Sequence, residues 1–159
     1  MRDMKDLIAQ PQDLICPPDA IFDTAAVATL IDAAVQDAEG DATALQKSVV
    51  AILSDRLKSG RAAIANGFTA RPFASRPTVR AYSWLTDCVI LTALDVVTRH
   101  IHPLSNPTDS ERITVFAVGG YGRGEMAPQS DVDLLFLTPY KITPWAESVI
   151  ESMLYILWD

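Results

Sequence analysis

Residues 115–137, VFAVGGYGRGEMAPQSDVDLLFL, decide the fold of the second half of this 159-residue chain. They predict a short apolar strand, a glycine-rich turn and a second strand that opens with two carboxylates at alternate positions. The expected strands are residues 113–118 and 132–137, and both are apolar enough to be buried. Four of the chain's seven glycines lie in the turn between them, at positions 119, 120, 122 and 124.

Two common phosphate-binding glycine motifs do not fit this turn. A dinucleotide fingerprint counted from Gly120 needs a final glycine where Glu125 stands. A Walker A loop needs Lys and then Ser or Thr after its last glycine, but Glu125 and Met126 follow Gly124. With both motifs excluded, the pattern left to explain is a strand, a glycine turn and then the pair Asp131 and Asp133.

These residue types suit chemistry on a nucleoside triphosphate. Glycines let the backbone approach a ligand closely and form anion-binding nests. On a strand, positions two apart face the same way, so Asp131 and Asp133 are expected to project together and hold Mg²⁺, with triphosphate oxygens completing its coordination. Arg123 pairs either with a phosphate or with Glu125, as a brace of the turn. The alternative is that both acids are surface residues of the turn and strand edge that only keep the hairpin hydrated.

The string GGYGRGEM at 119–126, followed by Pro128 and SDVDLL at 130–135, resembles the bacterial uridylyltransferase/uridylyl-removing enzymes of the nitrogen-regulatory protein PII. These belong to the nucleotidyltransferase superfamily that includes DNA polymerase β. The helical region and residues 154–159 are also similar to that family, but only residues 118–135 are specific. The resemblance implies Mg²⁺-dependent transfer of UMP from UTP to a tyrosine of PII, with release of pyrophosphate. The choice of UTP depends on the resemblance alone.

The same resemblance assigns roles by position. The catalytic, metal-binding residues would be Asp131 and Asp133. The nucleotide-binding residues would be Gly119, Gly120, Gly122, Arg123 and Ser130. Many superfamily members have Ser where this chain has Gly120.

The superfamily also has a third carboxylate on a later strand, and nothing after the strand that contains Asp133 reads as a further strand. The chain is therefore interpreted as an N-terminal fragment that is inactive or nearly so by itself, without the family's hydrolase and glutamine-sensing domains. Two alternatives stay open. One is another protein nucleotidyltransferase, such as a glutamine synthetase adenylyltransferase, whose turn looks more like G-K-L-G-G-R-E. The other is a degenerate, non-catalytic module that binds nucleotide or protein.

The predicted fold class is α+β: a helical N-terminal region and then the start of a polymerase-β-like sheet, apparently truncated. We expect a loosely ordered segment at 1–18, a helical region at 19–103 and an incomplete nucleotidyltransferase domain at 104–159. The expected helices run from Asp23 or Thr24 to about Glu39, from Asp41 to near Gly67, from Val79 to His100, and from Pro144 onward. Residues 69–77 are expected to form a loop.

Composition narrows the functional class. The net charge of −7 argues against a nucleic-acid partner. The longest apolar stretch, 88–97, is interrupted by Asp95 and too short to span a bilayer, so no membrane role is expected. Cys16 and Cys88 form no metal or redox motif, which favours a reduced, cytoplasmic setting.

Three other features have two interpretations each. The pair His100 and His102 marks a helix end rather than a metal site. Tyr121 either packs or stacks on a base. The arginines at 71, 76 and 80 belong to a solvated loop or meet an anionic partner.

Overall fold

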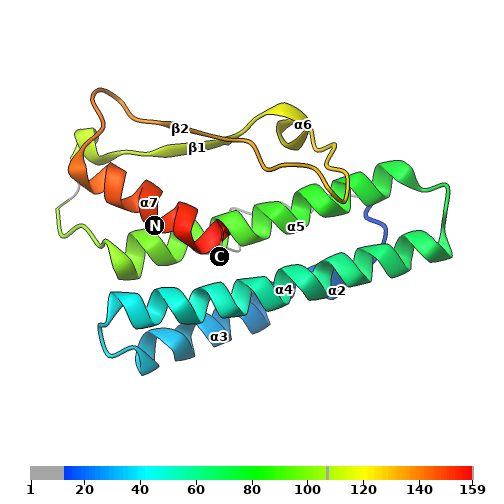
Figure 1. Cartoon of the computed structure of the whole chain (residues 1–159), viewed down its shortest axis with the longest axis horizontal. Coiled ribbons are helices and arrows are strands. Elements are labelled where there is room, and N and C mark those ends of the chain that lie inside the picture. The colour runs from blue at the N-terminus through cyan, green and yellow to red at the C-terminus, as the bar shows by residue number, and fades with distance from the viewer. Residues whose placement is uncertain (1–12, 107, 159) are drawn as a thin grey trace.

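Four long helices, several short helical turns and a β-hairpin make up the fold of the computed structural model, which describes residues 13–106 and 108–158 (Figure 1). The helical region contains a short helix α2 (Pro18–Ile21) and three long ones, α3 (Thr24–Asp37), α4 (Ala42–Ala70) and α5 (Ser75–Val96). Helix α5 continues as a π-helical turn, η1 (Val97–Ile101). The second half contains a 3₁₀ turn, η2 (Asp109–Glu111), the strands β1 (Thr114–Ala117) and β2 (Leu134–Leu137), a single helical turn α6 (Gly119–Gly122) and the helix α7 (Pro144–Trp158).

Local sequence signals set the ends of most helices. The carboxylates of Asp23 and Asp41 accept hydrogen bonds from the first amides of α3 and α4, which confirms both as N-caps. Helix α3 ends at Asp37, two residues before the expected Glu39. Helix α7 begins at Pro144 as predicted, because proline lacks only an amide that the first turn leaves unpaired anyway.

The predicted loop at 69–77 is wrong, because two helices extend into it. Helix α4 runs past Gly67 to Ala70, and at Gly67 the helix approaches Ile15 so closely that a Cβ would lie 3.2 Å from its Cγ1. Helix α5 begins at Ser75 rather than Val79. Pro77 falls in its first turn, where proline is tolerated. The loop shortens to residues 71–74.

The expected loosely ordered segment at 1–18 lies mostly outside the described residues, and its last residues pack against the helices. Ile15 is buried, and the Arg71 guanidinium donates hydrogen bonds to the carbonyls of Leu14 and Ile15. Pro18 begins α2. Arg71 is exposed, as expected for a solvated loop, and these hydrogen bonds give it a structural role as well.

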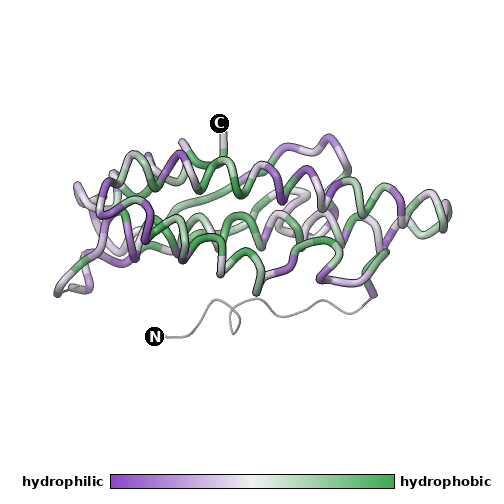
Figure 2. Tube along the Cα trace, turned by 90° about the horizontal axis from the view of Figure 1, so that it is seen from below, coloured by the Kyte–Doolittle hydropathy of each residue, from purple (hydrophilic) through white to green (hydrophobic). Residues whose placement is uncertain are grey.

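The core lies between α4 and α5, with α3 on the outer side of α4 and α7 against α4 and α5 (Figure 1). Apolar positions recur along the helices between hydrophilic ones, as amphipathic helices require (Figure 2). The span Ser75–Ile101 is long and apolar enough to cross a membrane, and it exceeds the stretch 88–97 considered from sequence. Most of its apolar residues are buried within the protein, so it forms the core helix.

The two strands form an antiparallel hairpin in which Ala117 pairs with Leu134 and Val115 with Phe136. The prediction that both strands are buried is wrong. Val115, Leu134 and Phe136 are partly buried, whereas Phe116, Leu135 and Leu137 on the other face are each 46–47% exposed. One face of the hairpin packs on the helices, and the other is apolar and open.

Candidate active site

The glycine turn and the paired acids lie at the same end of the β-hairpin. The last strand pair is Ala117 with Leu134, and just beyond it the Val118 amide donates a hydrogen bond to the Asp133 carbonyl, with an N···O distance of 3.1 Å. This pairing places Gly119, the next residue, beside Asp133. The hairpin register therefore brings together two parts of the motif that are fourteen residues apart in the chain.

Gly119 and Asp133 are in close contact, and the backbone conformation at Gly119 favours glycine. Gly119 has φ +62°, a left-handed conformation that disfavours other residues. A Cβ built on Gly119 would lie 2.5 Å from Oδ2 of Asp133. A residue expected to bind phosphate and a residue expected to bind metal are thus neighbours.

Asp131 and Ser130 lie in the loop before β2, since that strand begins at Leu134 rather than at the expected residue 132. The idea that both acids lie on a strand is therefore wrong. Asp131 and Asp133 are both exposed. The Ser130 hydroxyl accepts a hydrogen bond from the Ala127 amide at 2.9 Å, and the Ser130 amide donates to the Ala127 carbonyl. Ser130 closes a turn that leads into the acids, and its contact with a phosphate stays a prediction.

The other glycines of the turn have unequal surroundings. At Gly122 a Cβ would lie 2.5 Å from the Ala117 carbonyl oxygen, so this glycine allows α6 to pack against the end of β1. At Gly120 the nearest atoms to a built Cβ are 3.8 Å and 4.0 Å away, which is ordinary contact. Position 120 thus has room for the serine that many superfamily members carry. The nucleotide contacts of both glycines stay predictions.

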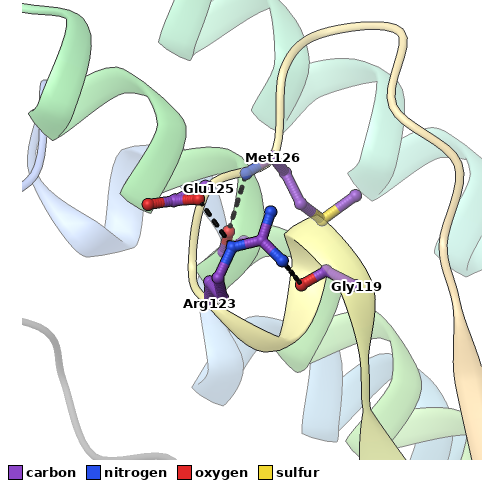
Figure 3. A network of polar contacts seen from close by, with 5 residues as sticks. Gly119, Arg123, Glu125 and Met126 are labelled. Atoms are coloured by element: carbon purple, nitrogen blue, oxygen red, sulfur yellow. Dashed lines mark hydrogen bonds and ion pairs between the residues drawn. The ribbon is translucent and has the colours of Figure 1, made fainter.

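Arg123 braces the turn. Its Nε donates to Oε2 of Glu125 at 2.9 Å, and its Nη1 donates to the Gly119 carbonyl at 2.9 Å (Figure 3). Both side chains of the ion pair are more than 60% exposed, and such surface pairs contribute about 0–1 kcal/mol. Of the two interpretations made from sequence, the structure has the ion pair. A phosphate contact by the guanidinium stays a prediction.

Sequence reasoning missed two residues of α5 that hold the turn. The Tyr121 hydroxyl donates to Oδ1 of Asp87 at 2.6 Å. The Met126 amide donates to the Ser83 hydroxyl at 3.4 Å, and Figure 3 shows this contact at Met126. Tyr121 is 6% exposed, so of its two interpretations packing is confirmed. Little in the sequence marks Ser83 and Asp87, because they are two of several polar residues spread along α5.

The buried contact alters the ionisation of both groups. Burial raises the pKa of Asp87 above its ordinary value, and the hydrogen bond from Tyr121 offsets part of this rise. Burial, together with the hydrogen bond to Asp87, raises the pKa of Tyr121 so that its phenol stays neutral. Burial also raises the pKa of the Cys88 thiol, which makes it a poor nucleophile. The Tyr121 phenol and the Cys88 thiol therefore stay protonated, and Asp87 serves as the acceptor for the Tyr121 hydroxyl.

The histidine pair lies at the end of the α5–η1 helix, as predicted. His102 Nε2 is 2.9 Å from the Ser152 hydroxyl of α7, and Trp145 donates its indole N–H to the His102 carbonyl. Within residues 13–106 and 108–158, no group of three or more His, Cys, Asp or Glu side chains has the geometry of a metal site.

The sequence matches a family model described as a nucleotidyltransferase domain, over residues 105–152. It is 63% identical over 139 residues to the bifunctional uridylyltransferase/uridylyl-removing enzyme of Ruegeria pomeroyi, which covers 87% of this chain and 15% of that protein. The enzyme of the same name from Cereibacter sphaeroides is 51% identical over 148 residues, covering 92% of this chain and 16% of that protein. No solved structure matches the chain.

The hairpin, the glycine turn and these matches together define the class: the chain belongs to the nucleotidyltransferase family. Its relatives then narrow the assignment, since it corresponds to a segment of a bifunctional uridylyltransferase/uridylyl-removing enzyme. The chain spans about 15% of the length of the curated relatives that it matches.

Proposed function

We propose that this chain supplies the nucleotide-binding part of an enzyme that transfers UMP from UTP to a tyrosine of the PII protein in the cytoplasm. The observation that carries the proposal is the contact between Asp133 and Gly119, because it puts an acid next to the first residue of the glycine turn. In this reaction the tyrosine oxygen forms a bond to the α-phosphorus. The bond from that phosphorus to the pyrophosphate oxygen breaks, and pyrophosphate leaves.

Asp131 and Asp133 fit a divalent metal by their chemistry. Both are exposed carboxylates, and Mg²⁺ in phosphate-transfer sites takes one or two carboxylates together with phosphate oxygens and water. When bound, Mg²⁺ would neutralise the charge that develops on the phosphates. The side chains of Asp131 and Asp133 would hold it. The amides at the start of α6 lack helical acceptors and would face the triphosphate.

The chain is suited to binding rather than to the complete reaction. A phenol has an ordinary pKa of about 10, so the tyrosine proton needs a base. Between residues 134 and 158 the only acids are Glu147 and Glu151, and both lie on α7 rather than on a further strand beside the paired aspartates. We therefore expect the 159-residue chain to bind Mg–UTP without transferring UMP.

The transfer itself is tested in a chimera in which this chain replaces the aligned segment of the Ruegeria pomeroyi enzyme. Substituting Asp131→Asn and Asp133→Asn together should lower UMP incorporation into PII by on the order of 10³-fold, because the metal loses its charged ligands while side-chain shape is kept. Radiolabelled UTP gives the measurement.

The matched control is the pair Glu147→Gln and Glu151→Gln, which removes the same charge from exposed positions of α7. It should leave the rate within about twofold, since these acids lie on a helix outside the turn. Transfer at the normal rate by the Asp131→Asn, Asp133→Asn chimera would mean that the metal assignment is wrong. Label from ATP in place of UTP would favour an adenylyltransferase.

A further inference from the structure

We propose that Asp87 and Ser83 of α5 are positioning residues that hold the glycine turn in place for the nucleotide. The proposal rests on the proposed function, because the site that they position is the one assigned above to Mg–UTP. It adds a role for the helical region, which no sequence motif marks.

The two residues anchor the turn at two separated points. Ser83 and Asp87 are four residues apart, so they share one face of α5. Asp87 receives the Tyr121 hydroxyl inside α6, and Ser83 receives the Met126 amide where the turn ends. The Ser83 hydroxyl donates its own hydrogen to the Val79 carbonyl, which leaves its lone pairs as acceptors.

The Met126–Ser83 hydrogen bond is buried and the Tyr121–Asp87 hydrogen bond is partly buried. Tyr121 is 6% exposed and Met126 is 4% exposed, and both belong to the hydrophobic core that α5 contributes to. Removing one partner of a buried hydrogen bond leaves the other without compensation from solvent. The anchors therefore restrain the turn more than the exposed Arg123–Glu125 pair does.

The position of the turn determines how the site is assembled. A Cβ built on Gly119 would lie 2.5 Å from the Asp133 carboxylate, so the turn and this acid are direct neighbours. If α6 shifts over α5, the turn amides move relative to the acids that precede β2. A displacement of about 1 Å in a phosphate-transfer site is enough to lower activity on the order of 10²-fold.

The test uses the 159-residue chain and has two readouts. The first is hydrogen exchange of the amides of Gly122, Gly124 and Glu125, which bond to carbonyls within the turn. The second is the dissociation constant for Mg–UTP. In Tyr121→Phe we expect exchange of these amides to accelerate about tenfold and the dissociation constant to rise about tenfold, because the ring stays packed but the anchor is lost.

Asp87 provides a conservative rescue. Asp87→Asn keeps an oxygen that accepts from Tyr121, so it should bind Mg–UTP within about twofold of the unsubstituted chain. Asp87→Leu removes the acceptor and should behave like Tyr121→Phe. Controls are Tyr140→Phe, at an 83% exposed tyrosine, and Asp95→Asn, on the same helix but paired with Arg99. Both should leave exchange and binding unchanged, and circular dichroism checks that each variant folds.

Each outcome is decisive. Faster exchange with weaker binding, reversed in Asp87→Asn, supports positioning. Faster exchange with unchanged binding, or equal losses in Asp87→Asn and Asp87→Leu, overturns it. If the unsubstituted chain binds no Mg–UTP, its role as the nucleotide-binding part fails, and positioning fails with it. If the unsubstituted chain binds Mg–UTP and Tyr121→Phe changes neither exchange nor binding, only the positioning proposal is overturned.

Discussion

The adjacent glycines Gly119 and Gly120 differ in how much space their surroundings leave for a side chain. Gly119 has a positive φ and the Asp133 carboxylate against it, whereas Gly120 has neither. At the scale of single residues, the resemblance treats both as nucleotide-binding glycines. In the structure a side chain is disfavoured at position 119 by the positive φ, whereas position 120 has room for one.

Gly119→Ala should therefore destabilise the chain by about 1–3 kcal/mol, from the left-handed conformation and the contact with Asp133. Gly120→Ala should change the free energy of unfolding by less than about 0.5 kcal/mol, because its Cβ meets atoms only at 3.8 Å and beyond. Urea denaturation followed by circular dichroism measures both. Equal losses in the two variants would contradict the close approach of Asp133 to Gly119.

At the scale of elements, the long helices pack through small residues that leave no signal in their periodicity. Gly60 lies within α4, where helix propensity favours alanine by about 1 kcal/mol. A Cβ there would lie 2.5 Å from the Ile21 carbonyl oxygen and 2.8 Å from a methyl carbon of Leu85. Packing against α2 and α5, rather than helix propensity, therefore explains why position 60 is a glycine.

Gly60→Ala is expected to destabilise by about 1–3 kcal/mol, the cost of overpacking, although propensity alone predicts a gain. Ser59→Ala, one residue earlier on the exposed side of the same helix, is the control and should be neutral or slightly stabilising. Thermal unfolding of both variants provides the comparison. A rise in melting temperature for Gly60→Ala would rule out the tight crossing of α2, α4 and α5.

At the scale of the whole molecule, the hairpin covers the helices with one face and leaves the other open. The outward side chains of Phe116, Leu135 and Leu137 are about half exposed, as is usual for surfaces that bind apolar groups. The sequence pattern did not predict this exposure. Both strands are continuous apolar runs, which favour burial on both faces.

An apolar dye such as anilinonaphthalene sulfonate should bind this face. The double variant Phe116→Thr, Leu135→Thr should lower the dye fluorescence by roughly half, while threonine keeps the strand propensity. Phe73→Ser is the control: this residue is 98% exposed but isolated in the loop between α4 and α5, so its loss should matter little. Undiminished fluorescence in the double variant would mean that the dye binds elsewhere.

The sequence by itself determined the helix caps at Asp23 and Asp41, the hairpin, the glycine turn and the family, because these depend on residues close together in the chain. It also predicted the brace between Arg123 and Glu125 as one of two alternatives.

Only the tertiary structure decided which side chains meet across long separations. It brought Asp133 to Gly119 through the register of the hairpin, and it placed Tyr121 on Asp87 through the packing of α6 on α5. It also left one strand face open, which apolar composition could not reveal. The physical reason is that local patterns fix the conformation of short segments, whereas contacts between segments depend on how the whole chain excludes water from its core.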